Sequence, residues 1–187
     1  MLRSNEIHKL NMLKARMASD IRTAASDLRH LTQLDFETLT IKHNDGHGKS
    51  NIHVRDEFMS YATQKDSYNQ FQLIDQDGLE LLRVKASGGK PYIVPKNELQ
   101  NVKDNEYFQE TIRLNTNEFI HVSSLELNVE NGAIERPLKP VLRLAIPVFS
   151  RGGNKKGLIA ISVLGSKIIN YALETAEKGL DNILLMT

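Results

Sequence analysis

The segment that most limits how this chain folds is residues 4–34, which contains neither glycine nor proline. Apolar residues recur within it in two rows with near-heptad spacing: Leu10, Met17, Ala24 and Leu31 in one, and Leu13, Ile21 and Leu28 in the other. This spacing predicts one long amphipathic helix with Ser4 at its N-cap. The apolar stripe needs a partner. The sequence is compatible with two packing partners for this stripe: a sheet of the same domain, or the same helix in a second copy of the chain.

After residue 68 the chain changes to short apolar runs separated by turns. Residues 71–75 and 79–85 flank the turn at 76–78 and predict a β-hairpin. Further strands are predicted at 36–41, 119–124, 141–149 and 157–164, and shorter helices at 53–65, 104–114 and 167–178. The links between the later strands are short or polar, which favours antiparallel pairing. The pattern is that of an α+β domain built on one mostly antiparallel sheet.

Composition excludes several classes of protein. The 187 residues carry 24 Lys and Arg against 23 Asp and Glu, so the net charge of +1 provides no field that would attract nucleic acid. The absence of cysteine excludes disulfides and thiolate-ligated metals. The longest apolar run, residues 158–165, is far below the roughly 20 residues that a membrane-spanning helix needs.

No motif marks a catalytic centre, a cofactor site or a metal site. The segment 43–50 is similar to a phosphate-binding loop, but His43 stands where that motif requires its first glycine. His43, Asp45 and His47 lack a further ligand at the spacing of a structural zinc site. A calcium loop starting at Asp75 would need glycine at its sixth position and glutamate at its twelfth, where this chain has Glu80 and Ala86. A metal-dependent hydrolase using His43 and His47 remains only an alternative.

Arg83 and Arg143 each interrupt a strongly apolar strand. A guanidinium in such a place must be paired with a carboxylate or reach a solvent-lined cavity. One interpretation is a structural ion pair, with Glu80 or Glu135 as the partner. The other is an anion clamp in a ligand pocket, because arginine matches a carboxylate bidentately. The segments expected to face such a pocket carry Tyr92, Tyr107, His121 and Ser123.

A series of short matches, taken in order, relates the chain to a known family. They are residues 71–75, 78–80 and 82–84, then 98–101 and 107–108, then 122–123, 125–128, 130 and 132, then 135–137, 139–140, 143 and 147–149, and finally 157–164. With these, residues 58–165 resemble the Cache (PDC, PAS-like) sensor domains. Two departures are Ser124, where the family often has proline, and Glu126, where it often has aspartate. The Tyr–Arg–Trp–Tyr–Asp signature of the amino-acid-sensing branch has no match, so the resemblance implies no particular ligand.

The resemblance implies a PAS-like fold with a five-stranded antiparallel sheet. A long N-terminal helix would cross one face, and the helical insertion of residues 86–117 would cover a ligand pocket on the other. The implied organisation is a signalling and dimerisation helix at 1–35, a sensor domain at 36–165, and a connecting helix with the start of a following element at 166–187. The apolar residues 183–186 would then begin a second module of a double-Cache sensor.

The function implied by the resemblance is non-catalytic sensing of a small molecule outside the cytoplasm. Because two arginines are candidates for the site, the expected ligand is anionic. The implied partners are a second copy bound through the N-terminal helix and a membrane reached through flanking transmembrane helices; nucleic acid is not expected. The output domain would be a histidine kinase, a GGDEF cyclase or a chemoreceptor. The alternative is a PAS-like module that binds no ligand and serves dimerisation or protein interaction.

Overall fold

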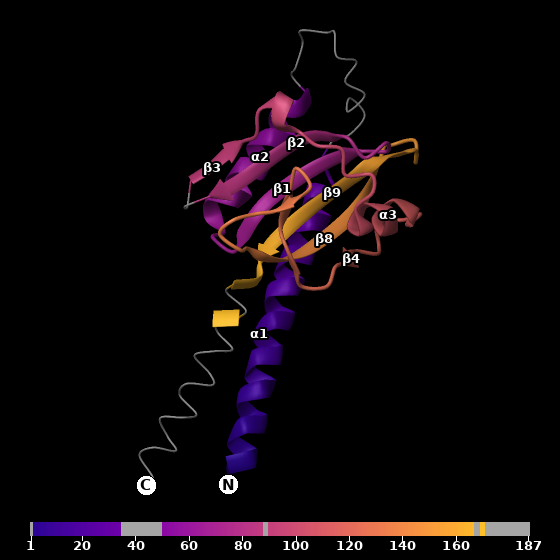
Figure 1. Ribbon diagram of the computed structural model, residues 1–187. Coiled ribbons are helices and arrows are strands. Elements are labelled where there is room, and N and C mark those ends of the chain that lie inside the picture. Colours follow the sequence, from indigo (N-terminus) through magenta and orange to yellow (C-terminus); the bar gives the residue numbers. More distant parts are fainter. Residues whose placement is uncertain (1, 35–49, 88–89, 167–168, 171–187) are drawn as a thin grey trace.

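A computed structural model of the chain describes residues 2–34, 50–87, 90–166 and 169–170 (Figure 1). The predicted strand at 36–41, the histidines at 43 and 47, most of the predicted helix at 167–178 and the apolar tail at 183–186 lie outside these ranges. The predicted N-terminal helix is confirmed as α1, Leu2–Leu31, and the next helix as α2, Ser50–Gln64.

Helix α1 has two parts with different surroundings. Ala24, Leu28 and Leu31 in its C-terminal part are fully buried against the sheet. The N-terminal part extends well beyond the sheet (Figure 1), and Ile7 is 59% exposed there. One apolar stripe therefore packs on the sheet of its own domain only along its second half. Among the described residues, the first half has no covering element.

The sheet is antiparallel throughout, with strands in the order β3-β2-β1-β9-β8-β4 and β5 paired beside β4 on β8. Its strands are β1 Tyr68–Asp75, β2 Glu80–Ser87, β3 Lys90–Ile93, β4 His121–Val122, β5 Glu126–Leu127, β8 Pro140–Phe149 and β9 Lys155–Leu164. Five of the six predicted strands are confirmed as β2-β1-β9-β8-β4, and the sixth, at 36–41, lies outside the described residues. The sheet has seven strands where five were expected, because β3 and β5 add to it. The predicted strand at 119–124 is shorter in the structure, because only two of its residues pair with β8.

The chain between the strands supplies the elements over the second face. After β3 come the 3-10 turn η2, Lys96–Glu98, and the helix α3, Glu106–Arg113, which confirms the helix predicted at 104–114. Between β5 and β8 lies a small separate hairpin of β6, Val129–Glu130, and β7, Ala133–Ile134. The insertion therefore contributes a strand to the sheet edge as well as a helix over its face.

Strand alternation gives the two faces of the sheet different chemistry. One face is apolar except for the Tyr68 hydroxyl and packs under α1 and α2, with Phe71, Leu144 and Ile161 among its buried residues. The other face carries polar side chains in register: Lys85 pairs with Gln70, Gln70 with Ser162, and Ser162 with Arg143. A smaller apolar cluster on this second face includes Ala160 and two residues of α3, Tyr107 and Phe108. Polar positions in central strands thus identify the face that lies under the insertion.

Gly157 is required where β9 meets β1. Its φ is +148°, and a Cβ at this position would lie 2.0 Å from the carbonyl oxygen of Ile74. We expect Gly157→Ala to destabilise the domain by roughly 2–3 kcal/mol, because the central strand pair must separate to admit the methyl group. The matched control is Gly153→Ala, at φ +79° with no atom within 4 Å of the added Cβ, which should cost about 1 kcal/mol. Equal losses in urea unfolding would contradict this account.

Candidate functional site

A cavity of about 320 Å³ opens between α3, the strands β4 and β5, and the polar face of β8. Four of the six residues predicted for a ligand site line it: Tyr107, His121, Ser123 and Arg143. Its other lining residues are Asn105, Glu106, Val122, Ser124, Glu126, Leu127 and Val129. The sheet provides the floor through Arg143, and the start of α3 provides one wall. We refer to this cavity as the α3 pocket.

Arg143 lines the α3 pocket and is almost fully buried. Its Nη1 pairs with the carboxylate of Glu126, and its Nη2 donates to Oδ1 of Asn128 at 2.6 Å. The guanidinium also lies 5.3 Å from the ring centre of Tyr107, a cation–π distance. Its Nε has no hydrogen-bond partner among the described residues. Arg143 therefore combines both interpretations of the sequence: it forms an ion pair, and it lines the pocket.

Ser123 fixes the position of β4 against β8. Its Oγ accepts a hydrogen bond from the backbone N–H of Arg143 at 2.9 Å and donates to the carbonyl of Ser124 at 2.7 Å. His121 pairs across the strands with Ala145, on the same face as Arg143, and is partly exposed to the pocket. Ser123 is therefore engaged in the fold, whereas His121 has a side chain that is available to a bound molecule.

Arg83 lies on the same face of the sheet but outside the α3 pocket. Its Nη1 lies 3.3 Å from Glu80 and 3.4 Å from Glu130, and its Nη2 donates to the carbonyl of Glu98 at 2.7 Å. The Glu80 side chain is 0% exposed and also accepts from Gln72 at 2.6 Å and from the backbone N–H of Gln100 at 2.8 Å. The predicted pair with Glu80 is confirmed.

The remaining predicted residues lie elsewhere. Tyr92 pairs with Lys85 at the edge of the sheet, is 45% exposed, and does not line the α3 pocket. Glu135 pairs with neither arginine; instead it accepts a hydrogen bond from Lys139 at 2.7 Å. Arg143 pairs with Glu126, which the sequence did not indicate as an ion-pair partner.

Several polar residues of this face were missed from the sequence. Gln70 and Gln72 are almost fully buried in β1, and Ser162 is fully buried in β9. Five buried polar atoms on these strands have no hydrogen-bond partner among the described residues: Gln70 Oε1, Gln72 Oε1, Arg83 Nε, Arg143 Nε and Ser162 Oγ. Polar atoms are costly to bury without a partner, so these positions distinguish this face of the sheet from the apolar face under α1 and α2. The available signal was polar residues at alternate positions of otherwise apolar strands.

The charges at the α3 pocket do not favour a simple anion. Its ionisable lining comprises Glu106, Glu126, Arg143 and His121, so two carboxylates face one guanidinium. That guanidinium is already paired with Glu126. Glu106 is exposed at the start of α3 and has no ion-pair partner among the described residues. The arrangement favours a ligand with a positively charged group, with or without a carboxylate to meet Arg143.

The phenol of Tyr107 gives the domain a measurable pH dependence. Burial raises the pKa of Tyr107 from 10.0 to about 12, although the nearby Arg143 opposes the shift. Above pH 10 the unfolded chain therefore releases this proton while the folded domain keeps it, and stability falls as the pH rises. Between about pH 10 and 12 the loss should reach roughly 2–3 kcal/mol. Urea unfolding across this range should show a shallower decline for Tyr107→Phe; an identical decline would contradict the assignment.

Other kinds of site find no support in the part of the chain that the structure describes. No group of three or more His, Asp or Glu side chains there is arranged to hold a metal ion. None of the helices in the described ranges combines the length and apolar composition that crossing a membrane requires.

A family model described as bacterial histidine kinase, sensor domain, matches residues 16–176, which include the sheet, the insertion and the second half of α1. No curated protein sequence matches the chain significantly.

Solved structures share the fold. The extracellular domain of a protein described as a histidine kinase, vpHK1S-Z8, matches with a TM-score of 0.69 at 21% identity, over 89% of this chain and 60% of that one. The sensory domain of the Campylobacter jejuni chemoreceptor Tlp3, with isoleucine bound, matches with a TM-score of 0.65 at 15% identity, over 90% of this chain and 61% of that one. The ligand-binding domain of the Pseudomonas aeruginosa chemoreceptor PctC, in complex with GABA, matches with a TM-score of 0.55 at 10% identity, over 90% of this chain and 67% of that one. The chain spans about three fifths of the first two.

Proposed function

The chain belongs to the family of bacterial histidine kinase sensor domains, and we propose that it is the extracytoplasmic ligand-binding module of a membrane-anchored histidine kinase. In this role it performs no catalysis itself. Its parts are a signalling and dimerisation helix at 1–35, a sensor domain at 36–165, and a connection at 166–187 to a second module. The matched sensor domains are longer than this chain, which supports a second module.

The ligand we propose is a small amine or amino acid held in the α3 pocket. The observation that carries this proposal is the charge arrangement there: Glu106 and Glu126 can receive an ammonium group, and the buried Arg143 can receive a carboxylate. The similar chemoreceptor domains were solved with isoleucine and with GABA, and both molecules carry an amine and a carboxylate. An anionic ligand remains the second candidate, because Nε of Arg143 is a buried donor with no hydrogen-bond partner among the described residues.

Binding can reach α1 through the sheet. Arg143 faces the α3 pocket, whereas the adjacent Leu144 faces the core beneath α1. On that side the carboxylate of Asp27 in α1 accepts hydrogen bonds from Tyr68 of β1 and, at 2.5 Å, from Lys65. We expect closure of α3 over the ligand to tilt the sheet against α1 and so shift this helix relative to its dimer mate. A ligand drives such a change only through its higher affinity for the closed state.

The test is a thermal-shift screen of this domain against amino acids, amines, carboxylates and sugars. We expect one amine-bearing class to raise Tm by several degrees. The shift should be lost in His121→Ala and weakened in Glu106→Gln, since both side chains line the pocket without holding the fold together. The matched control is His53→Ala, an exposed histidine on α2. A well-folded domain with no shift in any class would overturn ligand sensing and favour a module that only dimerises.

A further inference from the structure

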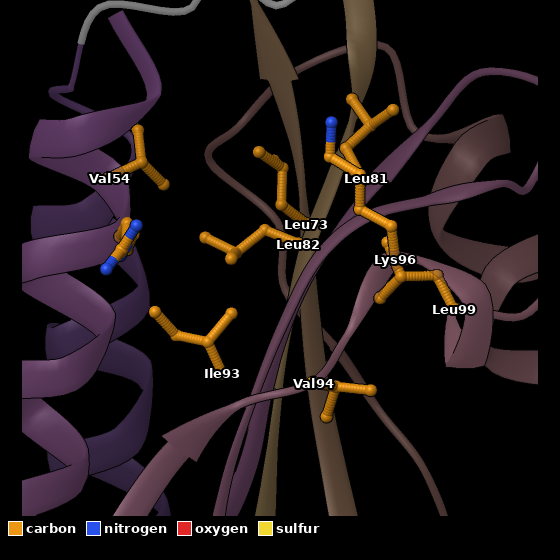
Figure 2. Close-up of a pocket in the computed structure, with 9 residues that line it drawn as sticks. Val54, Leu73, Leu81, Leu82, Ile93, Val94, Lys96 and Leu99 are labelled. Carbon is orange, nitrogen blue, oxygen red and sulfur yellow. The ribbon is translucent and has the colours of Figure 1, made fainter. Parts of the chain in front are cut away.

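A second cavity lies on the other side of the sheet from the α3 pocket, between α2 and the strands β2 and β3 (Figure 2). Its volume is about 170 Å³. Seven of its nine lining residues are aliphatic: Val54, Leu73, Leu81, Leu82, Ile93, Val94 and Leu99. Figure 2 shows Val54 on the α2 side of this space, Ile93 and Val94 on the β3 side, and Leu82 between them. We refer to this cavity as the α2 cavity.

The α2 cavity is an apolar hollow in this layer that opens to the surface beside the exposed Arg55 and Lys96. Protein interiors pack as densely as organic crystals, and voids larger than a water molecule are few. The cavity is a poor site for water, because its seven aliphatic side chains offer a water molecule no hydrogen bonds. An engineered apolar cavity of about 150 Å³ in another protein stays dry and binds benzene. A hydrocarbon group of about six carbons is therefore the kind of occupant that suits the α2 cavity.

Both polar residues of the lining are cations. Arg55 comes from α2 and Lys96 from η2, and both are exposed residues. Neither side chain has an ion pair or a hydrogen bond to another described residue. Figure 2 shows Lys96 on the side of the space where Leu81 and Leu99 lie, away from Val54. An apolar cavity whose charged lining, among the described residues, is cationic complements a molecule with an apolar body and an anionic head.

We infer that the α2 cavity is a second ligand site, which takes a carboxylate with a short hydrocarbon chain. The chain would lie among Leu73, Leu82 and Ile93, and the carboxylate would lie at the opening, within reach of Arg55 or Lys96. This site is separate from the α3 pocket: Leu73 and Leu82 belong to the apolar layer under α1 and α2, whereas Arg143 lies on the opposite face. Occupancy would brace α2 against the β2–β3 edge.

The test measures binding of three probes of similar shape by calorimetry: hexanoate, hexanol and hexylammonium. We expect hexanoate to bind about tenfold more tightly than either of the others. The double variant Arg55→Gln/Lys96→Gln should remove this preference, and both sites are exposed, so the fold is retained. The matched control is Lys90→Gln, an exposed lysine of β3 outside the cavity lining. Equal binding of the three probes, or none, would overturn the proposal.

Two further variants locate the site. Ile93→Phe fills the α2 cavity and should abolish hexanoate binding. His121→Ala alters the α3 pocket and should leave hexanoate binding unchanged. Loss of hexanoate binding in His121→Ala but not in Ile93→Phe would place the probe in the α3 pocket and overturn the proposal. Failure of the α3 pocket to bind any amine would leave this test unaffected.

Discussion

Replacing Arg83 with methionine should destabilise the domain by about 3–5 kcal/mol, because it leaves the Glu80 carboxylate buried without its cation. The Glu80 side chain is 0% exposed, and the Arg83 guanidinium lies 3.3 Å from it. Arg83 also anchors the insertion through the carbonyl of Glu98 and the β6–β7 hairpin through Glu130. Chemical denaturation at neutral pH measures the loss.

A second substitution, at Glu80, distinguishes two causes of the lost stability: an unpaired buried charge and the loss of packing. Glu80→Gln/Arg83→Met removes both charges and should recover a large part of the stability, since an ion pair replaced by neutral groups of similar volume is often tolerated. Gln at position 80 can still accept a hydrogen bond from the backbone N–H of Gln100. A double variant as unstable as Arg83→Met alone would show that the pair contributes through packing and not through charge compensation.

Phe71→Ala should lower the free energy of unfolding by about 3–5 kcal/mol, the range typical of a large ring removed from a core. Phe71 is fully buried in β1, and its ring centre lies 5.4 Å from that of Phe58 and 5.3 Å from that of Tyr68. This aromatic group joins α2 to the central strand, so its loss leaves a cavity that the helix cannot easily fill.

The control for Phe71→Ala is the same substitution at the surface. Phe119 is 62% exposed, and Phe119→Ala should change the free energy of unfolding by less than about 0.5 kcal/mol. Thermal or urea unfolding of the two variants under identical conditions makes the comparison. A loss at Phe71 no larger than that at Phe119 would contradict the placement of the core between the helices and the sheet.

The main elements of the fold could be predicted because their local patterns agree with their final positions. The runs at 68–75 and 80–87 are joined by a glycine turn, and β8 and β9 are long apolar segments in the centre of the sheet. The two-residue strands β5, β6 and β7 could not be placed in this way, and β4 is shorter than the strand predicted at 119–124. They form only where the chain meets β8 or folds back on itself, and Leu125, Leu127 and Val129 remain exposed despite their apolar character.

The site was predicted in part for a related reason. Alternation along a strand places Arg143 with Ala145 on one face, but the sequence does not say which face lies under α3. Arg83 and Arg143 share that face and differ only in what covers them: the segment around Glu98 and the β6–β7 hairpin cover Arg83. These contacts join residues far apart in sequence, so no local pattern separates the structural arginine from the pocket arginine.

The most direct test of the central claim is an amide NMR titration of this domain with the amine or amino acid that gives the largest thermal shift. We predict saturable changes concentrated at the α3 pocket, at Tyr107, His121 and Arg143, with smaller changes transmitted to the buried half of α1 around Asp27. Changes spread evenly over the surface, or absent from the α3 pocket, would contradict the account of this domain as a small-molecule sensor.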